Sequence, residues 1–119
     1  MKPREFVQAC KQTRDELLET YLWKGRTTVS TYIDEANLSV EQREKIVAAL
    51  DVALTDAFYT MLIGLAGAAS LGSTQQEYRL ADENSQAMFP AASLEDDLES
   101  LAYEFFHQGQ PSPGRRPPD

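Results

Sequence analysis

The feature that most constrains the fold is a run of helical periodicity between residues 39 and 65. Ser39 and Gln42 form the spacing of a capping box, which marks the start of a helix. Apolar residues then recur every three or four positions for about five turns. They are Ile46, Val47, Leu50, Ala53, Leu54, Ala57, Phe58, Met61, Leu62 and Leu65. Because no ionisable charge follows Asp56 until Glu77, we predict a central core helix whose second half is buried on most sides.

Two helical segments are predicted before it. The first runs from about Pro3 to Leu22, because proline suits a first helical position, and Gly25 ends it. Its apolar stripe consists of Phe6, Cys10, Leu17 and Tyr21, broadened by Val7, Leu18 and Leu22. Residues 27–37 have two interpretations: their β-branched residues favour an extended strand, whereas Val29, Ile33 and Ala36 are spaced for a short helix closed by Asn37. We favour the short helix.

A hairpin and a last helix are predicted after residue 65. Tyr78 and Leu80 alternate with polar residues, and Ala87 and Phe89 alternate after a polar turn at 82–85, which is typical of a β-hairpin. Ser93 is the predicted N-cap of the last helix, with acidic residues in its first turn. The predicted apolar stripe of this helix is Leu94, Leu98, Leu101 and Phe105, widened by Ala102 and Phe106, and Gly109 ends it.

Together these elements predict an α+β fold: a small helical bundle of three to four helices with one antiparallel β-hairpin before the last helix. Residues 1–109 are expected to form a single globular domain. Residues 110–119 hold four prolines without periodicity, so we expect a disordered tail. The apolar part of the uncharged run 57–76 is shorter than the roughly 20 residues needed to span a bilayer. With no secretory signal and a single cysteine, we expect a cytoplasmic protein.

Charge is distributed unevenly along the chain. Residues 1–45 carry eight Lys or Arg and eight Asp or Glu, whereas residues 46–114 carry ten acids and one basic residue, Arg79. A negative field of this kind favours basic protein surfaces and opposes nucleic acid and anionic lipid. The expected partner is therefore a basic protein, not a nucleic acid or a membrane.

The residue inventory argues against catalysis. His107 and Cys10 are the only His and Cys, which is too few for a zinc site, and neither lies in a motif of a Cys–His nucleophile pair. The glycines match no phosphate-binding loop, and neither 82–84 nor 95–99 matches a calcium loop. We expect no enzymatic activity, no cofactor and no metal.

A likeness to known proteins lies in residues 40–107. It rests on the run from Asp56 to Gly72, on Gln75-Gln76-Glu77-Tyr78 and on the run from Leu98 to Phe106. These segments resemble small uncharacterised bacterial proteins, similar in class to the immunity proteins of polymorphic-toxin systems, which are short, acidic and without enzymatic residues. The resemblance implies an inhibitory, protein-binding role and assigns no binding residue.

The functional hypothesis is a non-enzymatic acidic protein-binding domain, in its sharpest form an inhibitor or immunity protein that covers a basic partner surface. The alternatives are an accessory or structural domain with no inhibitory role and, less favoured, an enzyme using acidic residues. The candidate partner-binding residues are acids of the C-terminal half and one flanking tyrosine: Asp82, Glu83, Glu95, Asp96, Asp97, Glu99 and Tyr103.

Overall fold

The structure is a computed structural model that describes residues 1–108. Its helices are α1 (Pro3–Glu19), α2 (Thr28–Glu35), α3 (Val40–Leu65) and α4 (Leu98–His107), and its strands are β1 (Leu80–Ala81) and β2 (Ala87–Phe89). A π-helical turn, η1 (Thr20–Lys24), continues α1, and a 3-10 turn, η2 (Leu94–Asp96), precedes α4. The predicted α+β helical bundle with an antiparallel hairpin before the last helix is confirmed. The predicted tail and the stop at Gly109 lie outside the described residues.

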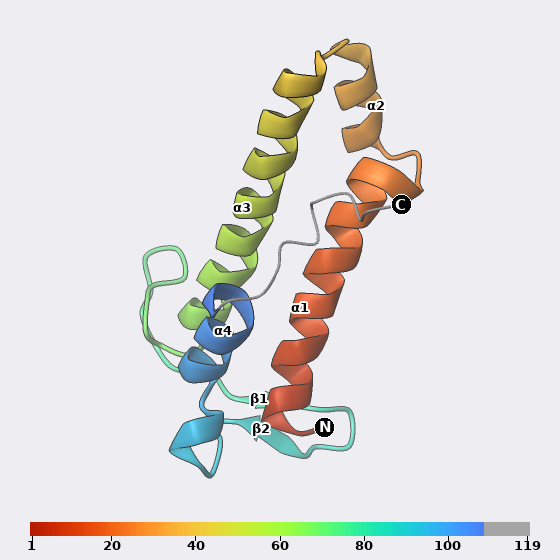
Figure 1. Cartoon of the computed structure of the whole chain (residues 1–119). Coiled ribbons are helices and arrows are strands. Elements are labelled where there is room, and N and C mark those ends of the chain that lie inside the picture. Colours follow the sequence, from red (N-terminus) through yellow and green to blue (C-terminus); the bar gives the residue numbers. More distant parts are fainter. Residues whose placement is uncertain (109–119) are drawn as a thin grey trace.

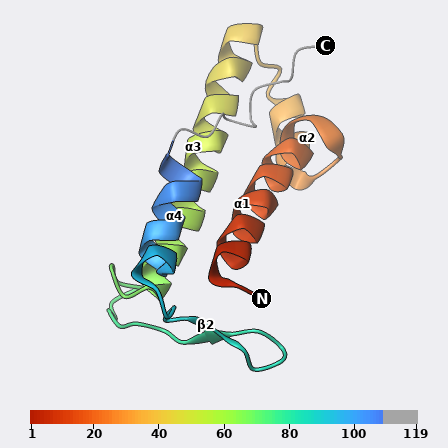
Figure 2. The ribbon, with the colours of Figure 1, turned by 60° about the horizontal axis from the view of Figure 1, so that its bottom comes forward.

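The helices α1 and α3 run in opposite directions, and α2 joins them at one end of the molecule (Figure 1). At the other end α4 packs against both, and the hairpin lies across the bottom of the bundle (Figures 1 and 2). This arrangement gives the molecule two unlike ends: a pair of long helices at the α2 end and a fuller bundle at the hairpin end.

The hydrophobic core lies at the hairpin end. Its buried members come from α1, α3, β2 and α4, and they are Val7, Leu62, Met88, Phe89, Leu98, Leu101, Ala102 and Phe106. Phe6 meets Phe89 edge to face at 5.9 Å between ring centroids, and Phe58 stacks on Phe106 at 6.2 Å. These aromatic pairs join both ends of the sequence to one core.

The predicted burial of α3 is wrong. Of its residues only Leu62 and Gly64 are buried, while Val52 and Met61 are 59% and 54% exposed. The reason is that α1 and α4 pack on one side of α3, and neither α2 nor the hairpin covers the opposite side within the described chain. The absence of charge after Asp56 therefore reflects an apolar surface as well as a core.

The short helix favoured for residues 27–37 is confirmed as α2. Thr27 is its N-cap, and Thr27 and Ser30 form a reciprocal capping box, with each side chain accepting a hydrogen bond from the other residue's backbone N–H. Asn37, with a φ of 49°, takes the left-handed conformation that ends a helix. Local capping decided between the strand and the helix here.

The predicted start of the last helix is wrong by one turn. Ser93 caps η2, not α4, and Asp97 is the N-cap of α4, its Oδ1 accepting a hydrogen bond from Ser100 N–H at 2.9 Å. Glu95 and Asp96 thus lie in a separate 3-10 turn. Leu94, predicted in the apolar stripe, is 88% exposed, because this turn carries it away from the core.

The segment after α3 is fastened to the end of that helix. Tyr78 N–H donates to the carbonyl oxygen of Leu65 at 3.0 Å, which holds residues 77–78 beside the last turn of α3. Gly67, with a φ of 80°, makes the reversal possible, since an added Cβ would lie 3.0 Å from the backbone nitrogen of Glu77.

Candidate functional site

An open pocket of about 190 Å³ lies where α3 ends and α4 begins. Four segments line it: the end of α3, residues 77–78, the end of β2 with the residues after it, and the start of α4. The lining residues are Leu65, Ala66, Glu77, Tyr78, Phe89, Pro90, Ala91, Ser93, Leu94, Asp97, Leu98 and Glu99. The pocket combines an apolar surface with several carboxylates.

The charges of the pocket are all negative. Glu77, Asp97 and Glu99 contribute carboxylates, and the lining contains no Lys, Arg or His. Glu77 and Glu99 are exposed, and neither has an ion-pair partner among the described residues, whereas Asp97 is engaged as the cap of α4. Like charges gathered in a concavity concentrate the negative potential there, which favours a cationic ligand.

Asp82 and Glu83 lie elsewhere. They occupy the turn of the hairpin, and Figures 1 and 2 place this turn and the η2–α4 junction at opposite ends of the hairpin. Asp82 pairs with the Met1 ammonium group at 2.6 Å and accepts hydrogen bonds from the backbone N–H of Asn84 and Gln86. The ammonium group and these hydrogen bonds lower the pKa of Asp82. Asp82 thus stabilises the turn, while Glu83 is exposed.

The remaining predicted residues lie around the start of α4. Glu95 is exposed and Asp96 half-buried in η2, close in sequence to the pocket residues Asp97 and Glu99. Tyr103 is 51% exposed further along α4, with its ring 6.0 Å from that of His107, which in turn contacts Tyr59 edge to face. Of the predicted residues, the structure therefore brings Asp97 and Glu99 into one pocket and leaves the two hairpin acids apart from them.

Sequence reasoning missed Glu77 and Leu94 as site residues. Glu77 lies between Gln76 and Tyr78 in a segment read only as a strand, and Leu94 was assigned to a helix stripe. A usable indication existed for Leu94: it stands between Ser93 and three acids, a polar surrounding that suits an exposed turn.

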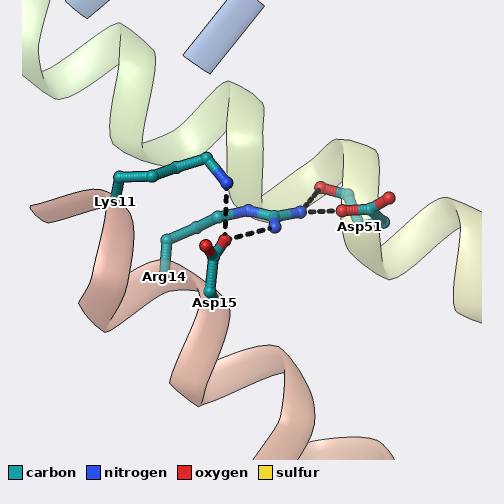
Figure 3. A network of polar contacts seen from close by, with 4 residues as sticks. All are labelled: Lys11, Arg14, Asp15 and Asp51. Atoms are coloured by element: carbon teal, nitrogen blue, oxygen red, sulfur yellow. Dashed lines mark hydrogen bonds and ion pairs between the residues drawn. The ribbon is translucent and has the colours of Figure 1, made fainter. Parts of the chain in front are cut away.

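A buried charge lies away from the pocket, between α1 and α3. The Arg14 side chain is 1% exposed, and its guanidinium donates to Asp15 Oδ1 at 2.9 Å, to the carbonyl oxygen of Asp51 at 2.6 Å and to the Asp51 carboxylate (Figure 3). Lys11 Nζ adds a further ion pair to Asp15 at 2.7 Å. All four groups join two helices to each other, so we assign this network a structural role.

The described residues hold no group of three or more His, Cys, Asp and Glu side chains placed to bind a metal ion. Cys10 is half-buried against the core, and this burial raises the pKa of its thiol. A raised pKa leaves less of the reactive thiolate at neutral pH.

Comparison of the chain with protein-family models, with curated proteins and with solved structures finds no match. Within the described residues α3 is long and apolar enough to cross a membrane by length and composition alone, a test that the core helix of a soluble protein also passes. The candidate site therefore stands on its own geometry and charge.

Proposed function

We propose that this protein is a cytoplasmic, non-enzymatic protein-binding domain that receives a basic side chain of a partner protein in the pocket between α3 and α4. One observation carries the proposal: Glu77, Asp97 and Glu99 share a pocket with Leu65, Phe89 and Leu98 and with no positively charged residue. Lysine and arginine have apolar stems and charged ends. A pocket with apolar and anionic lining suits both parts of such a side chain.

The surroundings of the pocket support a protein partner over a small cation. Leu94 lines the pocket and is 88% exposed, a large apolar side chain in contact with solvent. Exposed apolar residues beside charged ones are typical of interaction surfaces, where apolar anchors supply affinity and charges supply specificity and association rate. An inhibitor or immunity protein that covers a basic functional surface is the sharpest form of this proposal.

The experiment is a selection of binding peptides from a random library displayed on phage, with the immobilised full chain as bait. We expect enriched sequences that place Lys or Arg beside an apolar residue. In the variant Glu77→Gln/Glu99→Gln this enrichment is lost. A matched control, Glu41→Gln/Glu44→Gln, removes two exposed carboxylates from the far end of α3 and keeps the enrichment.

The peptides also allow a kinetic measurement. Charges at the edge of a binding surface act mainly on the association rate. Salt screens them over a Debye length of about 8 Å at physiological ionic strength. We expect the association rate of an enriched peptide to fall with added salt and with Glu99→Lys. Asp97→Lys is unsuitable for this purpose because Asp97 caps α4. Enrichment of acidic or purely apolar peptides would contradict the proposal. Enrichment of the same basic peptides by Glu77→Gln/Glu99→Gln as by wild type would contradict it too.

A further inference from the structure

The outer side of α3 is an exposed, largely apolar helix face with a charge of opposite sign at each end. We define this outer face by six residues: Lys45, Ala48, Ala49, Val52, Ala53 and Asp56, all of which are exposed. Val52 is 59% exposed in the middle of the face. The exposed surface of a helix in a monomer is normally polar, whereas this face has four apolar residues, Ala48, Ala49, Val52 and Ala53, between its two charged ends, which suggests a contact surface.

The spacing of the outer face is that of a helix-pairing seam. Lys45, Ala49, Val52 and Asp56 follow one another by four, three and four residues, which places them in one line along the helix. Alanine at most of the contact positions allows two helix axes to approach to the near end of the usual range of about 8–10 Å.

We propose that the outer face binds the same face of a second copy of this chain, with the two α3 helices antiparallel about a two-fold axis between residues 50 and 51. This register sets Lys45 of one copy opposite Asp56 of the other, Ala48 opposite Ala53, and Ala49 opposite Val52. The contact is self-complementary, as a two-fold interface requires. The inference is independent of the proposed function.

Charge complementarity selects this occupant and this orientation. Neither Lys45 nor Asp56 has an ion-pair partner among residues 1–108. In the antiparallel pair Lys45 of each copy meets Asp56 of the other, so the ion pair occurs twice across the two-fold axis. A parallel pair would set Lys45 against Lys45 and Asp56 against Asp56, which is repulsive. The two charges thus specify orientation while the apolar residues between them supply burial.

Two other occupants fit the face less well. Residues 109–119 contain no Leu, Ile, Val, Met or aromatic residue, so they offer little apolar surface to cover Val52 and the alanines. A bilayer in contact with this face would have to accommodate Lys45 and Asp56 within the face itself, and charges are disfavoured in such an apolar surrounding. A second copy compensates both charges.

The expected dimer is reversible. A single helix pair over about three turns covers less than the roughly 1,600 Å² of a standard interface, so we expect dissociation in the micromolar range. The pocket is lined by Leu65 and Ala66 at the end of α3, outside the outer face. The dimer therefore leaves both pockets open, roughly 40 Å apart along the helix direction, on opposite ends of the assembly.

The experiment measures the mass of the full chain by analytical ultracentrifugation across a concentration series. Wild type is expected to shift from monomer to dimer as concentration rises. Lys45→Glu sets acid against acid and Asp56→Lys sets base against base, so each single variant weakens dimerisation at least tenfold. The exchanged variant Lys45→Asp/Asp56→Lys restores the pairing and the dimer. Val52→Lys abolishes it, while Glu44→Lys, on a neighbouring face, does not.

A carbodiimide cross-link identifies the contact itself. When isotope-labelled and unlabelled chains are mixed, we expect a cross-linked peptide pair in which Lys45 of a labelled chain is joined to Asp56 of an unlabelled chain, or the reverse. Such a pair can form only between two copies. A wild type that stays monomeric at all concentrations overturns the proposal. Flotation with phosphatidylcholine vesicles then tests whether the outer face binds a bilayer instead, and deletion of residues 109–119 tests whether that segment covers it. A dimer that survives Val52→Lys, or is not restored by the charge exchange, overturns the proposal equally.

Discussion

Removal of the Asp51 side chain should destabilise the protein more than removal of its partner Arg14. In wild type the Arg14 guanidinium is buried between α1 and α3 and makes contacts with Asp15 and with the carbonyl and carboxylate of Asp51. Asp51→Ala leaves this cation buried with one carboxylate fewer. Breaking a buried pair in this way costs about 3–5 kcal/mol.

The structure places the cost at the lower end of that range. Asp15 Oδ1 and the backbone carbonyl of residue 51 remain as acceptors at 2.9 and 2.6 Å. We therefore expect a loss of about 3 kcal/mol for Asp51→Ala, and a fall in melting temperature of roughly 12 °C for a domain of this size.

Arg14→Met is the complementary change. It removes the buried cation and keeps an apolar stem of similar length, while Asp51, 20% exposed, gains access to water. We expect it to cost about 1 kcal/mol, because replacing a buried charge by a packed apolar side chain is often near neutral. In the double variant Asp51→Ala adds little, which gives a coupling free energy of about 2–3 kcal/mol.

The assay is denaturant unfolding of wild type, both single variants and the double variant at one fixed protein concentration. Glu44→Ala, an exposed acid on the same helix, is the control and should stay within about 0.5 kcal/mol of wild type. A cost of Asp51→Ala below that of Arg14→Met, or additive costs in the double variant, would show that the buried cation is not what the carboxylate stabilises.

Three further predictions concern the core, the loop and the surface. Leu62→Ala, at a site 4% exposed, should cost about 3–4 kcal/mol in denaturant unfolding, and Leu54→Ala, at a half-buried site, about 2 kcal/mol; the reverse order would contradict the placement of the core. Gly67→Ala should destabilise more than Gly72→Ala, since both have positive φ but only the first would press a Cβ against backbone, and equal melting temperatures would argue against this contact. Arg4 forms an ion pair with Glu104 and lowers the pKa of that carboxyl below its ordinary 4.5. Because the pKa is lowered in the folded state, the ion pair stabilises the fold fully above pH 4.5, and this stabilisation is lost as the pH falls through the folded-state pKa. The melting temperatures of wild type and Glu104→Gln should therefore converge in acid. A constant difference across pH would refute the assignment.

The sequence allowed the elements of the fold to be predicted because each has a local cause. Ser39 with Gln42, and the spacing of apolar residues after them, are sufficient for α3, and the polar turn at 82–85 is sufficient for the hairpin. The start of α4 was misplaced because Ser93 and Asp97 are both good caps, one turn apart. Only packing of the following residues against the core decides between two such caps.

Burial was the less predictable property. Periodicity shows which residues share a face of α3, but it does not show how many neighbours cover the helix, so an uncharged surface was read as a buried one. Arg14 had a visible indication, since Val7, Cys10, Arg14 and Leu18 follow one another by three or four residues and place a charge inside an apolar stripe. Its partner Asp51, by contrast, looked like an ordinary exposed acid.

The candidate site was predictable only in part because it joins segments that are distant in sequence. Glu99 and Asp97 were identified from the acidic cluster, whereas Glu77 reaches them through the reversal at Gly67 and the hydrogen bond between Tyr78 and Leu65. That reversal depends on a close backbone approach, which residue types alone do not reveal.

The two ends of the molecule differ in how they are stabilised, and this links the buried network to the proposed dimer. The buried residues of α3, Leu62 and Gly64, lie at the hairpin end, and α2 has none. Toward α2 the Arg14–Asp51 contact links α1 to α3, together with the hydrogen bond that Arg43 donates to the carbonyl oxygen of Leu22 at 3.2 Å. Asp51 lies between Ala49 and Val52 of the outer face, so a second copy would restrain the same turns of α3. A second copy that holds these turns in place would replace part of the restraint that Arg14 and Asp51 provide, so the cost of Asp51→Ala should be smaller in the dimer and should rise as the protein is diluted below the dissociation constant. A cost independent of concentration would mean that the network and the outer face are not energetically coupled.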